Sequence, residues 1–145
     1  MTELGLASDR DYVAFDFWRK RFLGTFRDTL VAGAVDPEFQ VQVVCLRGRQ
    51  GHPQLLATNR HVSCGGVDLE RVSWSGEALE GTSRVVTGDD YELYLTAPDG
   101  WTAESVDAPG AEAVLAVPRD GAVRVTIRGA KAGLLAWRVR YRRQR

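Results

Sequence analysis

Apolar and polar residues alternate along most of the chain. In the segment 122–129, AVRVTIRG, the apolar side chains of Val123, Val125 and Ile127 are separated by polar ones. A period of two is typical of a β-strand that buries one face and exposes the other. The segment 135–143, LAWRVRYRR, repeats the pattern. Shorter runs of the same kind cover 12–18, 21–27, 29–35, 39–46, 54–58, 67–74, 79–86, 91–98, 101–108 and 112–117.

Turn-forming residues separate these runs. Motifs such as DPE at 36–38, CGG at 64–66, SGE at 75–77 and PDG at 98–100 combine residues that favour chain reversal. They recur roughly every eight to twelve residues, which is the rhythm of hairpins in sandwiches, and no window has the period of a long amphipathic helix. We therefore expect an all-β fold, a two-sheet antiparallel β-sandwich of about nine or ten strands.

Length and composition agree with one globular domain. The chain has 145 residues, of which 44% are hydrophobic and 26% charged, and a chain of this length buries a core without cross-links. We assign residues 1–145 to a single β-sandwich domain and expect 1–10 to be a loose N-terminal segment. The formal net charge is zero, which gives no reason to expect a nucleic-acid partner.

Targeting signals are not visible. The N-terminal segment, MTELGLASDRDY, has no basic start followed by an apolar run, so no signal peptide is expected. A cytoplasmic location is the default expectation, and the sequence leaves it otherwise open. No apolar stretch reaches the length of a membrane helix, so no membrane partner is expected.

His61 and the two cysteines are the first candidates for chemistry. His61 and Cys64 are three residues apart, but a zinc site needs three or four protein ligands and a catalytic thiol needs an oriented base. The simpler interpretation is a histidine at a strand end whose ring hydrogen-bonds a neighbouring backbone group. We expect no metal and no cofactor. Cys45 and Cys64 are expected to be free thiols, although one bridge between them remains an alternative.

The carboxylates do not form an obvious catalytic pair. Asp89 and Asp90 are adjacent in a TGDD turn, whereas glycoside hydrolysis needs two carboxylates facing each other about 5 to 10 Å apart. Asp16 interrupts the aromatic run FDFW and is expected on the solvent face of a strand. If it is buried instead, it needs a partner such as an arginine. We expect no catalytic residue, and therefore no enzyme activity, in this chain.

The tryptophans are candidates either for the core or for ligand binding. Exposed aromatic rings serve as platforms for sugars, but large rings also fill sandwich cores. Trp137 is on the apolar side of its strand and is expected in the core, and Trp101 follows PDG and is a candidate for a rim. For each tryptophan taken singly the core is favoured. The candidate binding residues are Trp18, Trp74, Trp101 and His61.

Arginines at 138, 140, 142, 143 and 145 form a basic stripe near the C-terminal end. Such a stripe can read phosphate backbones. Charged residues also protect an edge strand from pairing with another chain. Because the whole chain is neutral, we favour the second interpretation.

Several segments resemble the C-terminal β-sandwich of α-galactosidase-like (melibiase-like) glycoside hydrolases. The most specific are YVAFDFW at 12–18, PQLLATNRH at 53–61 and VDLERVSWSGEALEG at 67–81. The resemblance covers about 12–101 and continues more loosely to 143. It implies a non-catalytic accessory domain in bacterial carbohydrate metabolism, packed against a catalytic (β/α)8 barrel in cis or in trans. The family's catalytic aspartates lie on the barrel and have no counterpart in this chain.

Two other functions remain open at this point. The supply of Trp and Tyr is compatible with an autonomous carbohydrate-binding module, so carbohydrate is a candidate ligand. The arginine stripe is compatible with a nucleic-acid or protein-interaction module.

Overall fold

The computed structural model describes residues 5–35, 37–38, 41–117 and 121–144. Within them the chain forms eleven strands, every pairing is antiparallel, and the strands make three sheets. The all-β sandwich prediction is confirmed, with one or two strands more than expected. The strands are β1 (Tyr12–Asp16), β2 (Arg21–Phe26), β3 (Val44–Gly48), β4 (Leu55–Thr58), β5 (Leu69–Trp74), β6 (Ala78–Val85), β7 (Tyr91–Thr96), β8 (Trp101–Asp107), β9 (Glu112–Ala116), β10 (Ala122–Arg128) and β11 (Gly133–Arg143).

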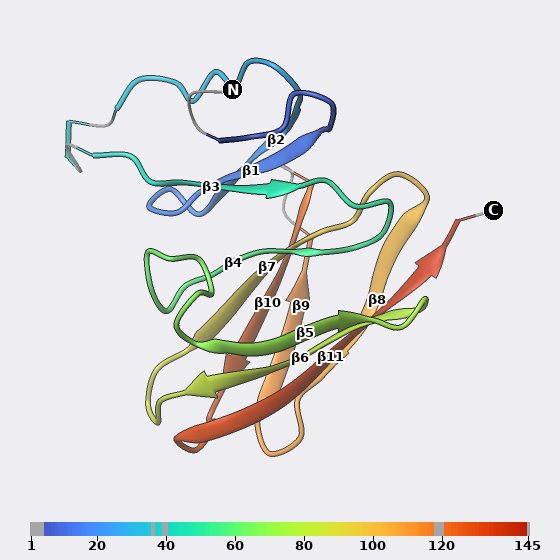
Figure 1. Ribbon diagram of the computed structural model, residues 1–145. Coiled ribbons are helices and arrows are strands. Elements are labelled where there is room, and N and C mark those ends of the chain that lie inside the picture. Colours follow the sequence, from blue (N-terminus) through green and yellow to red (C-terminus); the bar gives the residue numbers. More distant parts are fainter. Residues whose placement is uncertain (1–4, 36, 39–40, 118–120, 145) are drawn as a thin grey trace.

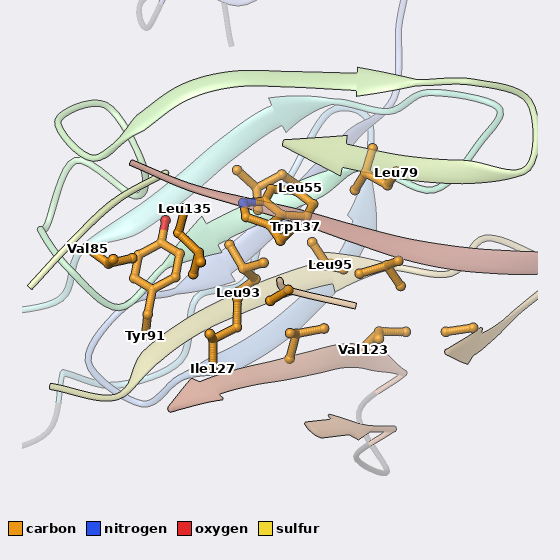
Figure 2. Close-up of a cluster of buried hydrophobic side chains, with 14 of the residues drawn as sticks. Leu55, Leu79, Val85, Tyr91, Leu93, Leu95, Val123, Ile127, Leu135 and Trp137 are labelled. Atoms are coloured by element: carbon orange, nitrogen blue, oxygen red, sulfur yellow. The ribbon is translucent and has the colours of Figure 1, made fainter. Parts of the chain in front are cut away.

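Two four-stranded sheets form the sandwich. The central sheet has the order β4-β7-β10-β9 and the second sheet the order β5-β6-β11-β8 (Figure 1). Their facing side chains interdigitate in one hydrophobic cluster, in which Leu93, Val125 and Val139 are fully buried (Figure 2). Each fully buried side chain of this kind stabilises the fold by roughly 1.5–3 kcal/mol. The alternation predicted for β10 and β11 is confirmed.

A buried polar chain crosses this apolar cluster. The Trp137 indole donates to Ser83 Oγ (2.9 Å), which lies 2.9 Å from the Tyr91 hydroxyl. Tyr91 donates in turn to Asp68 Oδ2 (2.6 Å). Burial, and after it the hydrogen bond to Asp68, raise the pKa of Tyr91 above its ordinary value. The hydroxyl therefore stays protonated and continues to donate to the carboxylate.

The third sheet covers part of the outer face of the central sheet. It has the order β2-β1-β3 and lies over β4 and β7 (Figure 1). Phe15 contacts the Tyr94 ring, with 4.6 Å between ring centroids, and Val13 and Leu56 belong to the same buried cluster. Strand β4 is consequently buried on both faces. The sandwich therefore carries an additional layer that the two-sheet prediction did not include.

The prediction that Asp16 faces solvent is wrong. Its side chain is 1% exposed instead of facing solvent. The carboxylate accepts hydrogen bonds from the Arg19 backbone N–H (3.1 Å) and the Gln42 amide (2.7 Å), and the Arg19 guanidinium lies 3.5 Å away. Two segments that flank the third sheet supply these partners, and they explain why a carboxylate is tolerated between two phenylalanines.

The prediction of a strand at 29–35 is also wrong. No strand forms there, since the Ala32 and Ala34 carbonyls accept hydrogen bonds from the side chains of Gln42 and Arg19 (both 2.9 Å) rather than from a neighbouring strand. The strand expected over 39–46 begins at Val44 and runs to Gly48. Phe39 and Gln40 lie outside the described residues.

The arginine stripe does not lie on an edge. Strand β11 pairs with β6 on one side and with β8 on the other, so the interpretation of edge protection is wrong. Arg138, Arg140 and Arg142 point to the solvent face of the second sheet, where Arg138 pairs with Glu80 and Arg142 lies 3.1 Å from Glu104. These acidic neighbours partly neutralise the stripe, which disfavours the phosphate-binding alternative.

The described part of the chain contains no helix that is long and apolar enough to cross a membrane.

Candidate functional site

The four candidate binding residues fall into two separate places. Trp18 and His61, which are far apart in sequence, line one pocket. Trp74 and Trp101 pack against each other in an aromatic cluster elsewhere, with 5.1 Å between ring centroids.

The Trp18 pocket has a volume of about 360 Å³. It lies between the turn that follows β1 and the segment that follows β4. Tyr94 of β7 also lines it. The lining residues are Phe17, Trp18, Lys20, Thr58, Asn59, Arg60, His61, Val62 and Tyr94. An aromatic wall therefore faces a wall with amide, guanidinium and imidazole groups.

Local backbone geometry holds the aromatic wall in place. Residues 17–20 form a turn in which Lys20 has φ of +49° and its N–H bonds to the Phe17 carbonyl (3.4 Å). The Phe17 N–H bonds to the Val43 carbonyl (3.0 Å), which ties the turn to the third sheet. The Phe17 ring meets the Trp18 ring edge-on at 4.9 Å. Trp18 itself is 41% exposed, so the core interpretation is wrong for this tryptophan.

A charged network lies behind the aromatic wall. The Lys20 ammonium donates to Glu92 Oε2 (2.7 Å), and the Tyr94 hydroxyl donates to the same oxygen (2.5 Å). Burial raises the pKa of the Glu92 carboxyl, but the hydrogen bonds from Lys20 and Tyr94 together lower it further, so it ends below its ordinary value. Glu92 is therefore ionised at neutral pH and holds the position of Lys20.

Arg60 supplies donors that are not fully used. Its Nη1 donates to Asp89 Oδ2 (2.8 Å), while Nε and Nη2 are buried and have no hydrogen-bond partner among the described residues. The neighbouring Asn59 is fully engaged, since its amide bonds to the Asp90 carbonyl and to the Glu92 N–H (both 2.9 Å). A buried N–H without an acceptor is unfavourable by about 1–3 kcal/mol. Because these two nitrogen atoms have almost no solvent-accessible surface, a ligand in the pocket does not reach them directly.

His61 makes the backbone hydrogen bond that was expected, but it lies beyond the end of β4, which stops at Thr58. The ring is exposed, and Nδ1 accepts a hydrogen bond from the Ser63 backbone N–H (3.1 Å). The predicted bond between the ring and a neighbouring backbone group is therefore present. Cys64 does not face the ring as a second ligand, because its thiol contacts the Val62 carbonyl (3.5 Å). Among the described residues no group of three or more His, Cys, Asp or Glu side chains is placed to hold a metal ion.

The Trp74 cluster is already filled by aromatic rings. His52 stacks on Trp74 with 5.3 Å between centroids and 3° between planes, and the Trp101 and Tyr141 rings meet it edge-on. Arg143 lies over Trp101, 6.0 Å from its centroid. A groove of about 630 Å³ runs beside His52 and Trp74. Because the His52 imidazole occupies one Trp74 face, this tryptophan is a poorer platform for a sugar than Trp18.

Comparison with models of protein families, with curated proteins and with solved structures finds no match for this chain. The resemblance to the α-galactosidase-like sandwich therefore stays a prediction.

Sequence reasoning missed Lys20 and Arg60 as members of the pocket. The signal for Arg60 was its position, directly before His61 and just after the buried run LLAT. The residues that directly follow a strand buried on both faces lie at the boundary between two layers, where pockets form. Lys20 had no comparable signal, because its role depends on Glu92, 72 residues away.

Proposed function

We propose that this chain is a non-catalytic accessory β-sandwich module of a carbohydrate-active protein. In this proposal it stands beside a catalytic (β/α)8 barrel of the α-galactosidase-like type, in the same chain or in a partner chain. It stabilises the barrel and contacts carbohydrate through the Trp18 pocket. The observation that carries the sugar contact is a half-exposed indole that lines one pocket with the exposed imidazole of His61.

The pocket suits the chemistry of a sugar. A pyranose ring has an apolar face that stacks on an indole, and its hydroxyl oxygens accept hydrogen bonds from N–H groups. Trp18 offers the ring, and the exposed His61 imidazole, whose Nδ1 accepts from the Ser63 N–H, offers Nε2 as a donor. Lys20 also lines the pocket, but its ammonium is held by Glu92. The volume of about 360 Å³ corresponds to one or two sugar rings, near the lower end of the range of small-molecule pockets.

The buried and partly buried carboxylates favour a supporting role over a catalytic one. Asp16 is bound by Arg19 and Gln42. The buried Asp68 accepts from Tyr91, and the partly buried Glu92 accepts from Lys20 and Tyr94. A general acid or base must exchange its proton with substrate within hydrogen-bond reach. Carboxylates that are engaged in bonds between layers of the fold are poorly placed for that exchange.

Sugar binding is tested by titrating the isotope-labelled chain with melibiose at millimolar concentration and following backbone amide resonances. We expect shifts confined to residues 17–20 and 58–62, because these segments form the two walls. Galactose alone should give the same pattern at higher concentration, and a sugar alcohol without a ring should give none.

Two variants sharpen the titration. Trp18→Ala should abolish the shifts, and Trp18→Phe should retain weaker ones, because a phenyl ring still provides a stacking face. Leu134→Ala is the matched control, since Leu134 is 63% exposed in the second sheet and does not line the pocket. Unchanged shifts in Trp18→Ala, or shifts centred on Trp74, would contradict the proposed site.

The non-catalytic part has its own test. The purified chain is assayed with p-nitrophenyl α-galactoside, and we expect no release of nitrophenol above the buffer rate. Turnover at an enzyme-like rate that survives repurification would refute the accessory role, whatever the outcome of the sugar titration.

A further inference from the structure

Two thiols from distant parts of the sequence meet beneath the third sheet. Cys45 lies on β3, and Cys64 lies in the turn segment that follows β4. Both are free; Cys64 is 2% exposed and Cys45 is half-buried. They pack in the same buried cluster as Leu56 and Phe15. Each thiol contacts a backbone carbonyl, Cys45 that of Leu56 (3.3 Å) and Cys64 that of Val62 (3.5 Å), and the two side chains are close enough to change each other's pKa.

Arg47 holds the two thiol-bearing segments together. Its Nε donates to the Leu56 carbonyl (2.8 Å) and its Nη2 to the Cys64 carbonyl (2.7 Å). The Cys45 thiol contacts the same Leu56 carbonyl (3.3 Å). The Arg47 guanidinium therefore bridges two carbonyl oxygens. One is that of Leu56, which also contacts the Cys45 sulfur, and the other is that of Cys64. This places both cysteines within the reach of one side chain.

The electrostatics make the two thiols unequal. The hydrogen bond from Cys64, aided by the positive charge of Arg47, lowers the pKa of the Cys45 thiol against the opposing effect of burial. The same hydrogen bond, and burial, raise the pKa of Cys64. Because the thiolate is the reactive form, Cys45 is the thiol that reacts first.

We propose that Cys45 and Cys64 form a reversible intramolecular disulfide, with Cys45 as the attacking thiol and a small-molecule disulfide as the oxidant. This site is independent of the proposed sugar binding. It makes the junction between the third sheet and the segment after β4 a modification site.

The reaction balances in two exchange steps. The Cys45 thiolate attacks one sulfur of the small disulfide, forming a mixed disulfide and releasing one small thiolate. Cys45 then no longer accepts a hydrogen bond from Cys64, so the main cause of the raised Cys64 pKa disappears. Cys64 loses its proton to solvent and attacks the Cys45 sulfur, which releases the second small thiolate. The protein is oxidised by two electrons and the small disulfide is reduced to two thiols.

The disulfide would join β3 to the segment that carries one wall of the Trp18 pocket. Cys64 is two residues from Val62, which lines that pocket. The bond closes a loop of about twenty residues, and such a closure restricts the unfolded chain. The oxidised protein should therefore melt at a higher temperature than the reduced one.

The test is incubation of the reduced full chain with glutathione disulfide, followed by intact mass and peptide mapping without reductant. We expect the mass to fall by two hydrogen atoms. The tryptic peptides 28–47 and 61–71 should be recovered as one linked species, and dithiothreitol should reverse both changes. A product that carries glutathione on one or both cysteines with no internal link, or no reaction at all, would overturn the proposal.

Single variants test the order of the steps. Cys64→Ser should stop at a mixed disulfide between glutathione and Cys45, whereas Cys45→Ser should remain largely unmodified. In the wild-type protein, brief treatment with iodoacetamide should label Cys45 before Cys64, which tests the order even if a variant fails to fold. Faster labelling of Cys64 would contradict the assignment of Cys45 as the attacking thiol.

Discussion

The two faces of the central sheet are covered in different ways. Toward the second sheet, aliphatic side chains such as Leu93, Leu95 and Val125 pack with no exposure to solvent. Toward the third sheet, the Tyr94 ring packs under Phe15, while its hydroxyl reaches Glu92 and Arg124 lies 5.4 Å above its ring. The first face is apolar apart from the buried chain that links Tyr91 to Ser83, Trp137 and Asp68. The other mixes aromatic packing with charge, and this is the face next to which the Trp18 pocket opens.

The difference explains where binding chemistry is found. The interface with the second sheet is closed to solvent, so its groups are not available to recognise a ligand. The mixed interface contains donors that packing alone does not satisfy, as Arg60 shows. We infer that the sandwich provides rigidity and that the junction with the third sheet provides recognition.

The largest expected effect comes from removing the ring that anchors the third sheet. Phe15→Ala should destabilise the protein by about 4 kcal/mol, because it deletes a fully buried aromatic side chain. Hydrogen exchange should show loss of protection in β1, β2 and β3 first, while β10 and β11 stay protected. Equal loss of protection in all three sheets would mean that the third sheet does not open separately from the sandwich.

A matched change inside the sandwich is Gly81→Ala. A Cβ at this position would lie 2.2 Å from Trp137 Cζ2 and 2.8 Å from the Arg71 carbonyl oxygen. Since a backbone atom cannot move aside easily, we expect about 3 kcal/mol of destabilisation by urea unfolding. Here protection should fall in the second sheet and the central sheet together, and a loss restricted to the third sheet would contradict the comparison.

The buried polar chain gives a smaller effect. Tyr91→Phe removes the donor to Asp68 and leaves that buried carboxylate oxygen without it. We expect a loss of about 2 kcal/mol in the free energy of unfolding. The double variant with Asp68→Asn should lose less than the sum of the single changes, and strict additivity would show that the two groups are not coupled.

The smallest expected effect concerns Glu92 at the mixed interface. Its pKa in the folded protein lies below the ordinary value of 4.5. The stabilisation from this shift is therefore fully present above pH 4.5 and is lost as pH falls through the lower folded value. Glu92→Gln should cost less than about 1 kcal/mol at neutral pH and should reduce the loss of melting temperature on acidification. If acidification lowers the melting temperature of Glu92→Gln as much as that of the wild type, other carboxylates cause the acid sensitivity.

Much of the sandwich could be predicted because alternation reports directly on burial. Val123, Val125 and Ile127 are fully buried, as their spacing predicted. The third layer could not be predicted in the same way. Tyr94 lies on the face opposite Leu93, and a tyrosine at such a position fits either a solvent face or a second buried face.

Long-range partners account for the remaining differences. Asp16 was expected on the solvent face, but it is buried because Arg19 and Gln42 reach it. The meeting of Trp18 and His61 in one pocket depends on the packing of the third sheet over β4 and β7. Neither local pattern nor spacing along the chain contains that information.

The central claim is that the Trp18 pocket is where this module meets a sugar. The most direct measurement is a crystal structure of the chain soaked in melibiose. We predict a sugar ring stacked on the Trp18 indole with a hydroxyl oxygen accepting from the His61 imidazole. A sugar bound only against the His52 and Trp74 rings, or a Trp18 pocket that stays without sugar at saturating concentration, would contradict the claim.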